Sequence, residues 1–594
     1  MSEAIVSCVK ISILLLFLPT VSTIEDSKHW HRLAEEELTE SLSYKWNTNI
    51  AKNVIIFVGD GMSPDTITAS RIFKNGETSY LSWEKFPHIG LLKTYNTNKQ
   101  VPDSASTATA IFGGVKTNFK VVGVDMNVPL ADCEASLNTD FHVQSIISWA
   151  QEVGKSTGFV TTTRVTHATP APLYAHCPDR RWECEAKKPA NAEKCKDIAR
   201  QLIENEPGKS IKVIMGGGRQ MLQSLLNGTA SDPIDKWACR SKDGRDLIEK
   251  WRQDKKSRKI SFEVVQNNEE LSKVDYEKTE FLFGIFANGH IAMDWQRDKS
   301  PKGQPSLEEM TAAAIKILDK SDKGYLLVVS GTLTANSEHL LLFRETERSS
   351  AYKWMKIQNG ANGFYTFTIT FERFSPNSRV QLLYYILNFL KVEGGLIDFA
   401  HHRGHAAQAL LETVRFSEAI NATLKLVNTE ETLVIVTSDH THSMAFNGYS
   451  ERGSSILGVA QKSKFDKISY TTLTYNTGGP NNIAYKVRNG EAVRMDPSLN
   501  DTTHYNYSQQ AAIISDEAYH GGGDVAVYAI GPQAHLFHST HEQNFVAHVI
   551  AYAAKIGPYK KVDHRKKSGA NQQWITHSSV IISIIMIVLF KIYH

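Results

Sequence analysis

A serine that directly follows an aspartate is the first candidate for chemistry in this sequence of 594 residues. Ser104 follows Asp103 and precedes the small residues 105–110, which suits a helix whose first turn approaches a ligand closely. The free N–H groups and the positive dipole end of a helix N-terminus favour a phosphate there. An ordinary N-cap formed by Asp103 or Ser104 explains the same pattern. By itself the stretch favours this second interpretation.

Carboxylates and imidazoles elsewhere in the chain could hold metal ions beside such a serine. Asp398 and His402 are four residues apart, so one helical turn would place them on the same face. A carboxylate with an imidazole is half of a zinc site. The same side-chain types recur at three further places: Asp60, the pair Asp439-His440, and His520. Each residue alone is more often a cap, a surface group or a core residue, and only their joint presence predicts a metal centre.

A serine hydroxyl is a weak nucleophile near neutral pH and needs activation. The sequence has no G-x-S-x-G elbow of a Ser–His–Asp hydrolase, whereas two metals about 4 Å apart could support an in-line displacement at phosphorus. A guanidinium would hold the non-bridging phosphate oxygens, and both Arg180 and Arg181 are candidates. His167 and Thr169 offer an imidazole and a hydroxyl nearby. A hydroxyl combined with carboxylates suits magnesium better than zinc.

The elements that must position these residues are predicted to be buried strands separated by helices. Six apolar runs are predicted strands: 53–58, 156–163, 211–215, 325–329, 432–437 and 525–530. Helical patterns follow or separate them, at 64–73, 306–318 and 405–426. Strands without alternation predict a doubly wound α/β fold, whose large, mostly parallel sheet has helices on both faces. Ligands bind outside the carboxyl ends of such strands, so we expect the dispersed residues to be neighbours.

Composition is that of a globular protein, with 41% hydrophobic and 22% charged residues. The formal net charge of +3 gives no reason to expect a nucleic acid partner. We predict a helical arm at 24–49 followed by one large α/β domain at 50–567. Within it, 448–510 is rich in Tyr, Thr, Asn, Gly and Ser and is interpreted as a small β-rich insertion near the mouth of the site.

A second insertion, 330–391, interrupts the α/β pattern and has no clean period. A stretch of about 60 residues without structure is unusual inside a compact domain. It is either a surface insertion or non-coding sequence translated by mistake. The second interpretation is favoured, because Leu326 to Val329 would join smoothly onto Val392-Glu393.

Both ends of the chain resemble targeting signals. An apolar run at 11–18 follows Lys10, which predicts a secretory signal peptide at 1–23. Small residues, a polar spacer and an apolar run follow one another within 568–594, the order of a glycosylphosphatidylinositol (GPI) anchor signal that is removed. A short transmembrane helix is the competing interpretation. We therefore expect a protein anchored to the extracellular face of the plasma membrane.

Cysteine and asparagine patterns agree with secretion. Five cysteines remain after Cys8 leaves with the signal, and the simplest arithmetic is two disulfides and one free thiol. Nearness in the sequence suggests the pair Cys177–Cys184. Four sequons predict N-glycosylation, at Asn227, Asn421, Asn500 and Asn506.

With these residues in view, the chain closely resembles the animal, membrane-anchored alkaline phosphatases. The resemblance spans roughly 53–559 apart from the insertion at 330–391. The motifs that carry it are VGDGM from Val58, VPDSASTATA from Val101, TTTRVTHATP from Thr161, VEGGLIDFAHH from Val392, TSDHTH from Thr437, YHGGGDVAVYAIGP from Tyr519 and QAHLFH from Gln533.

The resemblance implies a role for each matching residue. Ser104 is implied as the nucleophile that becomes phosphoserine, Arg180 rather than Arg181 as the phosphate-binding guanidinium, and His167 as a residue beside the magnesium and the substrate. One zinc is assigned to Asp60, Ser104, Asp439 and His440. The other zinc is assigned to Asp398, His402 and His520. Magnesium is assigned to Asp60, Thr169 and Glu393.

The same resemblance implies a homodimer that hydrolyses phosphate monoesters at alkaline pH, with two Zn²⁺ and one Mg²⁺ per subunit. It also implies a disulfide between Cys133 and Cys195 and a crown-like role for 448–510. The calcium site of some animal relatives is not expected, because its Phe-Glu pair is Phe286-Ala287 here. Two alternatives remain: a related phosphodiesterase or sulfatase, and a cell-surface protein whose catalysis is impaired by the insertion beside Glu393. The surroundings of Arg180 favour the monoesterase.

Overall fold

A computed structural model describes residues 25–236, 238–331, 356–359, 365–368 and 396–561. The predicted signal peptide, the predicted anchor signal, Glu393 and most of the insertion at 330–391 lie outside the described residues. The chain divides into two compact units, 1–46 and 47–594. In the first unit, helix α2 (Ser27–Ser43) begins at Asp26, whose Oδ1 accepts a hydrogen bond from the His29 N–H at 3.0 Å.

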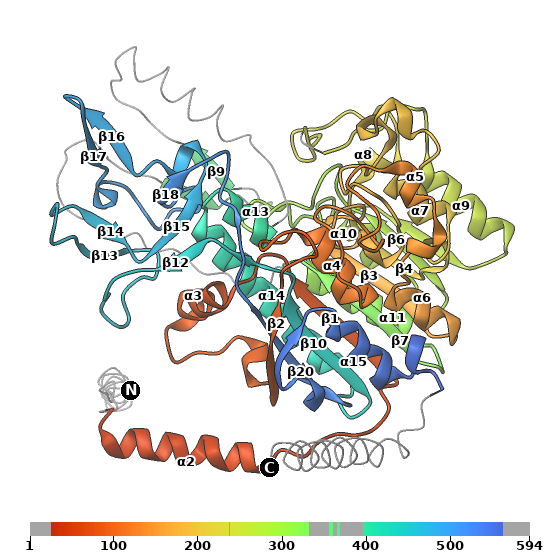
Figure 1. Ribbon diagram of the computed structural model, residues 1–594, viewed down its shortest axis with the longest axis horizontal. Helices are drawn as coiled ribbons and strands as arrows, with labels where there is room; N and C mark the ends of the chain where they lie inside the picture. Colours follow the sequence, from red (N-terminus) through yellow and green to blue (C-terminus); the bar gives the residue numbers. More distant parts are fainter. Residues whose placement is uncertain (1–24, 237, 332–355, 360–364, 369–395, 562–594) are drawn as a thin grey trace, which may run out of the picture. The chain divides into compact units, whose positions relative to one another are not determined.

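A ten-stranded sheet forms the centre of the second unit (Figure 1). Every pairing in it is parallel except the two that β20 makes with β10 and β2, so the predicted mostly parallel sheet is confirmed. In spatial order the strands are β21 (Ser539–Glu542), β2 (His88–Lys93), β20 (Val525–Ile530), β10 (Thr432–Ser438), β1 (Asn53–Gly59), β7 (Tyr325–Ser330), β3 (Ser156–Arg164), β4 (Val213–Gly217), β6 (Phe281–Ile285) and β5 (Phe262–Val265).

Both faces of this sheet are buried, as the continuous apolar strands predicted. Along β1, Val54, Ile56 and Val58 enter one hydrophobic cluster, while Ile55 and Phe57 enter the other. The first cluster is covered by α4 (Ser104–Gly113), α5 (Cys133–Ser136), α6 (Ile146–Glu152), α7 (Ile198–Glu204), α8 (Arg219–Leu222), α9 (Leu247–Ser257) and α15 (Phe545–Ala554). The second is covered by α3 (Pro64–Asn75), α10 (Asn268–Ser272), α11 (Leu307–Leu318), α13 (Leu396–His402) and α14 (Ala406–Leu426). The fold is therefore doubly wound.

The region 448–510 and the residues next to it form several small β-sheets. Its short strands confirm the predicted β-rich character. The strands pair as β12 (Met444–Phe446) with β15 (Leu473–Gly478), β15 with β18 (Ala511–Ile514), β13 (Val459–Lys462) with β14 (Ser469–Thr471), and β16 (Tyr485–Arg488) with β17 (Glu491–Arg494). Inside 330–391, β8 (Lys356–Asn359) and β9 (Tyr365–Thr368) form an antiparallel pair.

The disulfides confirm one prediction and correct another. Cys133 is bonded to Cys195, as expected. The predicted pair Cys177–Cys184 is wrong, because Cys184 is bonded to Cys239, with their Cα atoms 5.8 Å apart. Cys177 is a buried free thiol whose Sγ lies 3.3 Å from a backbone carbonyl oxygen. Nearness in sequence failed because a disulfide depends on the approach of Cα and Cβ atoms in space.

Disulfide mapping tests this corrected pairing. In an unreduced digest we expect cross-linked peptides that join Cys184 to Cys239 and, among the cysteines that the structure describes, a single free thiol at Cys177. Burial raises the pKa of the Cys177 thiol to about 12, so it should resist alkylation at pH 8 in the folded protein. It should react after denaturation. A peptide that links Cys177 to Cys184 would contradict the structure.

Core packing around β1 gives a test of the sheet assignment. Phe57 is fully buried, and its ring meets that of Phe416 edge-on at a centroid distance of 5.9 Å. Phe57→Ala should lower the free energy of unfolding by about 3–5 kcal/mol, seen as a lower midpoint in thermal unfolding. The matched control is Phe465→Ala, because the Phe465 side chain is 98% exposed. Equal effects of the two substitutions would contradict this core.

Candidate active site and metal centre

The carboxyl ends of β1 and β10 bring the first group of predicted residues together. Gly59 pairs with Ser438 in the parallel register, so Asp60 and Asp439 leave the sheet side by side. His440 Nε2 lies 3.4 Å from Asp60 Oδ1 and 3.4 Å from Asp439 Oδ2. These three side chains are buried and could share one metal ion.

Helix α4 presents its first residue to this group. Ser104 Oγ lies 3.3 Å from Asp60 Oδ1 and 3.2 Å from His440 Nε2. The preceding residue is the N-cap, since the Asp103 carboxylate accepts hydrogen bonds from the N–H groups of Ala105 and Ser106 at 3.2 and 3.4 Å. Asp103 is therefore the N-cap of α4, and the adjacent Ser104 is placed as the nucleophile interpretation requires.

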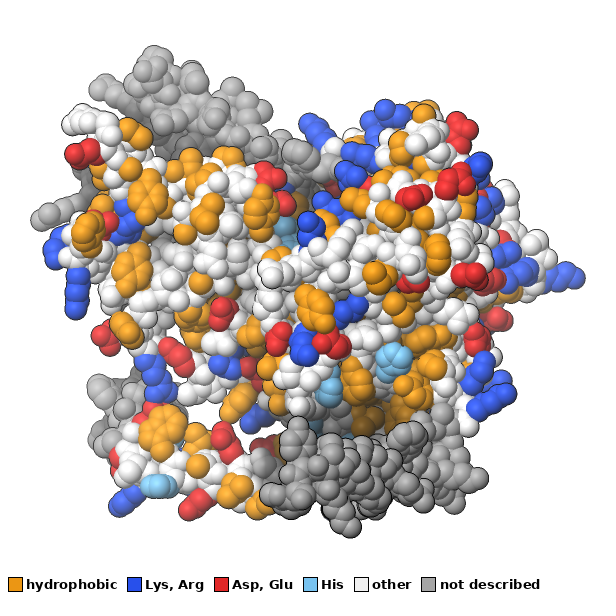
Figure 2. Space-filling model, viewed as in Figure 1, with side chains coloured by type: hydrophobic (Ala, Val, Ile, Leu, Met, Phe, Trp, Pro, Cys, Tyr) orange, Lys and Arg blue, Asp and Glu red, His pale blue; other side chains and the backbone are white. Residues whose placement is uncertain are grey.

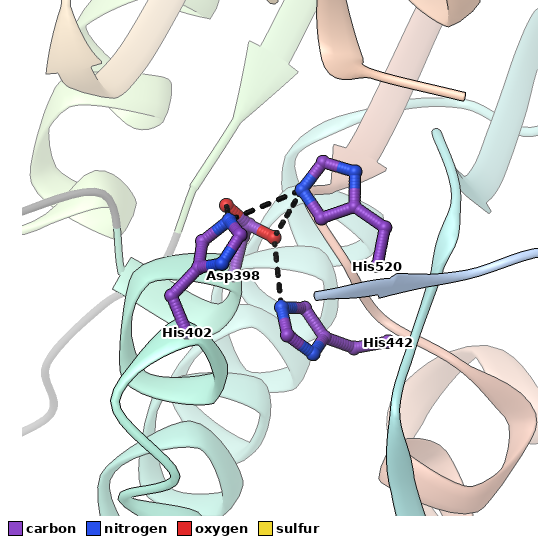
Figure 3. A group of neighbouring side chains, drawn as sticks. All are labelled: Asp398, His402, His442 and His520. Atoms are coloured by element: carbon purple, nitrogen blue, oxygen red, sulfur yellow. Dashed lines mark hydrogen bonds and ion pairs between the residues drawn. The ribbon is translucent and has the colours of Figure 1, made fainter. Parts of the chain in front are cut away.

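A second group lies beside the first and draws on three further elements (Figure 3). Asp398 and His402 lie one turn apart on α13, and His402 Nε2 is 3.1 Å from Asp398 Oδ2. His520 on β19 (His520–Gly521) reaches the same carboxylate, with Nε2 3.4 Å from Asp398 Oδ1. The His520 ring stacks on the His440 ring at a centroid distance of 3.6 Å. The predicted zinc ligands that lie within the described residues are thus neighbours, as expected.

Backbone carbonyls fix which nitrogen of each imidazole faces the centre. His402 Nδ1 is 2.6 Å from the Ala518 carbonyl oxygen, and His520 Nδ1 is 2.9 Å from that of Pro102. A carbonyl oxygen only accepts, so each Nδ1 carries the proton and donates it. Each Nε2 is then directed at the second group, and once it is deprotonated it offers the lone pair that a metal ligand requires.

Sequence reasoning missed His442, which lies on β11 (Thr441–His442). Its Nε2 is 3.5 Å from Asp398 Oδ1, inside the second group. Here the tautomer is reversed, because Nδ1 accepts the Ser443 N–H at 3.0 Å and the neutral ring must then carry its proton on Nε2. His442 therefore directs an N–H, not a lone pair, toward the Asp398 carboxylate, although no hydrogen bond forms at this distance. The signal was its position two residues after His440, on the same face of an extended chain.

The crowding of buried carboxylates gives the site its electrostatic character. Burial, together with the Asp398 charge, raises the pKa of Asp60, and burial beside Asp60 raises the pKa of Asp439 well above its usual range. Burial would also raise the pKa of Asp398, but the adjacent His402 and His520 hold it well below its usual value. Asp398 Oδ1 and Asp439 Oδ2 are buried without a hydrogen-bond donor. Such oxygens fit a cation, because unpaired buried charge is costly.

Gly61 lets the two groups approach each other. Its φ of +66° is in the left-handed region, and a Cβ there would lie 3.0 Å from Asp398 Oδ1. Its N–H donates to Asp439 Oδ1 at 3.0 Å. A side chain at this position would be strained and would push against a candidate ligand.

The third predicted site is described only in part. Thr169 Oγ1 donates to Asp60 Oδ2 at 3.1 Å, so the hydroxyl shares a carboxylate with the first group, while Glu393 lies outside the described residues. Burial and the adjacent Arg180 hold the pKa of His167 well below its usual range. His167 is therefore neutral, and its Nε2 accepts from the Arg180 guanidinium at 3.2 Å.

Arg180 and Arg181 occupy different surroundings, which separates the two candidates. Arg180 NH1 donates to Asp103 Oδ2 at 3.1 Å, directly beside Ser104, whereas Arg181 is held by Asp179 through several hydrogen bonds. Both line a cavity of about 390 Å³ whose floor includes Asp60, Asp398 and His402. The geometry favours Arg180 as the guanidinium nearest the serine.

Fold and site together define an α/β protein with two groups of metal-ligand type around a serine at a helix N-terminus. The sequence profile of the family "Alkaline phosphatase" matches residues 51–341 and 388–556. The chain belongs to the alkaline phosphatase family. The residues between the two matched parts, 342–387, fall inside the predicted insertion at 330–391.

Individual relatives agree with this membership. The chain is 38% identical to the tissue-nonspecific isozyme of alkaline phosphatase from Gallus gallus, over 90% of each chain. It is 35% identical to the membrane-bound alkaline phosphatase of Bombyx mori, over 90% of this chain and 87% of that one.

Solved structures show the same fold. Alkaline phosphatase from the Antarctic bacterium TAB5 has a TM-score of 0.51 at 21% identity, over 85% of this chain and 99% of that one. The enzyme from Thermus thermophilus has a TM-score of 0.52 at 20% identity, over 86% and 92%.

The stoichiometry and affinity of metal binding can distinguish a metal ligand, proposed for His402, from a residue that orients a ligand, proposed for His442. After chelator treatment, His402→Ala should bind one zinc ion fewer than the wild type even at saturating zinc. His442→Ala should reach the wild-type stoichiometry with an affinity weakened about 10- to 100-fold. Equilibrium dialysis measures both, and thermal unfolding checks that each variant is folded. If His442→Ala also lacks one equivalent at saturation, His442 is a ligand.

Proposed function

We propose that this protein hydrolyses phosphate monoesters to an alcohol and phosphate at alkaline pH, through a phosphoserine intermediate on Ser104. The observation that carries the proposal is the position of Ser104 Oγ, 3.3 Å from Asp60 Oδ1 and 3.2 Å from His440 Nε2. It stands at the N-terminus of α4 in a chain of the alkaline phosphatase family. Membership in that family favours the monoesterase over the phosphodiesterase and sulfatase alternatives.

Two zinc ions and one magnesium ion are the proposed cofactors. When bound, they would lower the pKa of hydroxyl groups in contact with them and neutralise charge on the phosphoryl oxygens. Asp60, Asp439, His440 and Ser104 would hold one zinc. Asp398, His402 and His520 would hold the other zinc. Asp60, Thr169 and Glu393 would hold magnesium, with His167 adjacent to it.

The residues of the chain bind and orient the phosphoryl group. The Arg180 guanidinium holds the non-bridging oxygens, and the positive dipole end of α4 favours their negative charge. Ser104 Oγ gives up its proton to solvent and forms a bond to phosphorus, while the bond from phosphorus to the ester oxygen breaks and that oxygen takes up a proton from solvent to leave as the alcohol. Water then attacks phosphorus and loses a proton, the bond from phosphorus to Ser104 Oγ breaks, Oγ takes up a proton again, and phosphate departs. Ester and water are thus converted to alcohol and phosphate.

The proposed location is the extracellular face of the plasma membrane, with a GPI anchor and a homodimeric assembly. The arrangement of residues at 568–594 supports the anchor, and a relative from Bombyx mori is named membrane-bound. Among the described residues, none of the helices has the length and hydrophobicity needed to span a bilayer. The four sequon asparagines are exposed, which supports N-glycosylation.

The nucleophile is tested by Ser104→Ala. Turnover of phenyl phosphate should fall by about a thousandfold or more, because the covalent route is lost. The serine supplies only one of several proposed ligands, so zinc content by atomic absorption should stay near that of the wild type. Ser454→Ala, at an exposed serine far along the chain, is the matched control. Retained turnover in Ser104→Ala would exclude Ser104 as the nucleophile.

A further inference from the structure

The cavity over the metal groups continues outward to a cationic rim. Besides the residues at its floor, it is lined by Arg181 and Lys187, two exposed side chains on the segment after β3. Lys187 ends a short 3-10 turn, Glu185–Lys187. In Figure 2, Lys and Arg side chains gather on one side of the hollow in which His side chains are visible.

Most of the charges that line this cavity are compensated by partners. The Arg164 guanidinium lies 2.8 Å from Glu183 and 3.1 Å from Asp235. Arg180 is paired with Asp103 at 3.1 Å. These pairs already satisfy one another, so they add little net charge at the cavity mouth.

The two rim cations differ from this pattern. Asp179 holds one edge of the Arg181 guanidinium, but the side chain is 64% exposed. The Lys187 ammonium has no ion-pair partner among the residues that the structure describes. Glu517 also lines the cavity, and its carboxylate lies 3.6 Å from His402 Nδ1. The lining of the cavity therefore carries two exposed cations, Arg181 and Lys187, besides the exposed Glu517 carboxylate.

A disulfide holds the chain segment that carries Lys187 in place. The Cys184–Cys239 bond joins the segment that carries Lys187 to the segment that carries Asp235 and Ala238, and both segments are walls of the cavity. A covalent tie between the two walls reduces the conformational entropy that the rim would otherwise lose on binding. The rim is thus built as part of the cavity rather than as a free surface loop.

We propose that Lys187, assisted by the outer edge of Arg181, binds a second anionic group on the alcohol part of the substrate. This inference rests on the proposed function, since the first anion is the phosphoryl group held at Ser104 and Arg180. The alcohol part must point from there toward the open end of the cavity, whose 390 Å³ suits a small molecule. The Lys187 ammonium attracts an anion in the cavity, whereas the Glu517 carboxylate repels one. The substrate class is phosphate monoesters that carry a carboxylate or a further phosphate.

Matched substrates test this subsite in the full-length, metal-loaded protein. The values of kcat/KM are measured for phenyl phosphate and for 3-carboxyphenyl phosphate with the wild type, Lys187→Gln and Lys187→Glu. Lys194→Gln is the control, because Lys194 is 72% exposed, pairs with Glu134 and is not part of the cavity lining. For each protein, kcat/KM for 3-carboxyphenyl phosphate is divided by kcat/KM for phenyl phosphate. The value for the variant divided by the value for the wild type is the ratio of ratios, in which the different leaving-group reactivities of the two esters cancel.

The expected result is a loss confined to the anionic ester. Lys187→Gln should lower kcat/KM for 3-carboxyphenyl phosphate about three- to fivefold and leave phenyl phosphate within about 1.5-fold, mainly through KM. Lys187→Glu should lower kcat/KM for 3-carboxyphenyl phosphate further. Added salt should reduce the preference of the wild type for this ester over phenyl phosphate. Lys194→Gln should change neither ester.

Two failures are distinguishable. If phenyl phosphate is hydrolysed but the ratio of ratios stays at one in both Lys187 variants, the second-anion subsite is wrong while the proposed function stands. If the wild type hydrolyses neither ester, the proposed function itself fails.

Discussion

The confinement of three carboxylates in one buried space is the constraint on which the rest of this structure depends. Asp60, Asp398 and Asp439 come from distant parts of the chain and meet at the carboxyl edge of the sheet, where two of their oxygens have no hydrogen-bond donor. Such a group is unfavourable without cations. The imidazoles, the serine hydroxyl and the proposed metal ions are therefore parts of a single electrostatic arrangement.

Backbone groups give this arrangement its precision. Carbonyl oxygens accept from the Nδ1 atoms of His402 and His520, while a backbone N–H donates to Nδ1 of His442. The same side-chain type thus faces the same carboxylate in opposite tautomers, once with a lone pair and once with a proton. Second partners of this kind hold ligands in place, and losing one typically weakens metal binding by about 10- to 100-fold.

The walls of the site have a different origin from its floor. The floor is formed by strand ends and by the first turns of helices, which the packed sheet holds rigidly. The wall that carries Lys187 consists of irregular chain, and the Cys184–Cys239 bond compensates for its lack of regular hydrogen bonding. The floor determines the reaction, and the walls are free to select among phosphate esters. Variation among members of one fold commonly follows this division.

The sequence by itself determined six of the ten strands of the sheet and most of the floor. Continuous apolar runs predicted β1, β3, β10 and β20, and the four-residue spacing of Asp398 and His402 predicted their shared helix face, because burial and helical periodicity act locally. The resemblance to alkaline phosphatases assigned roles in one site to residues that are far apart in the sequence and that local patterns cannot link. Glu393, the two ends of the chain and most of the insertion at 330–391 lie outside the described residues, so those predictions remain predictions.

Only the tertiary structure decided what depends on distance between remote segments. It replaced the pair Cys177–Cys184 by Cys184–Cys239, added His442 to the second group, and separated Arg180 from its neighbour Arg181. It also made β20 the antiparallel member of the sheet. Hydrogen-bond direction, disulfide geometry and strand order are set by atoms that meet across tens to hundreds of residues, and no spacing within one segment encodes them.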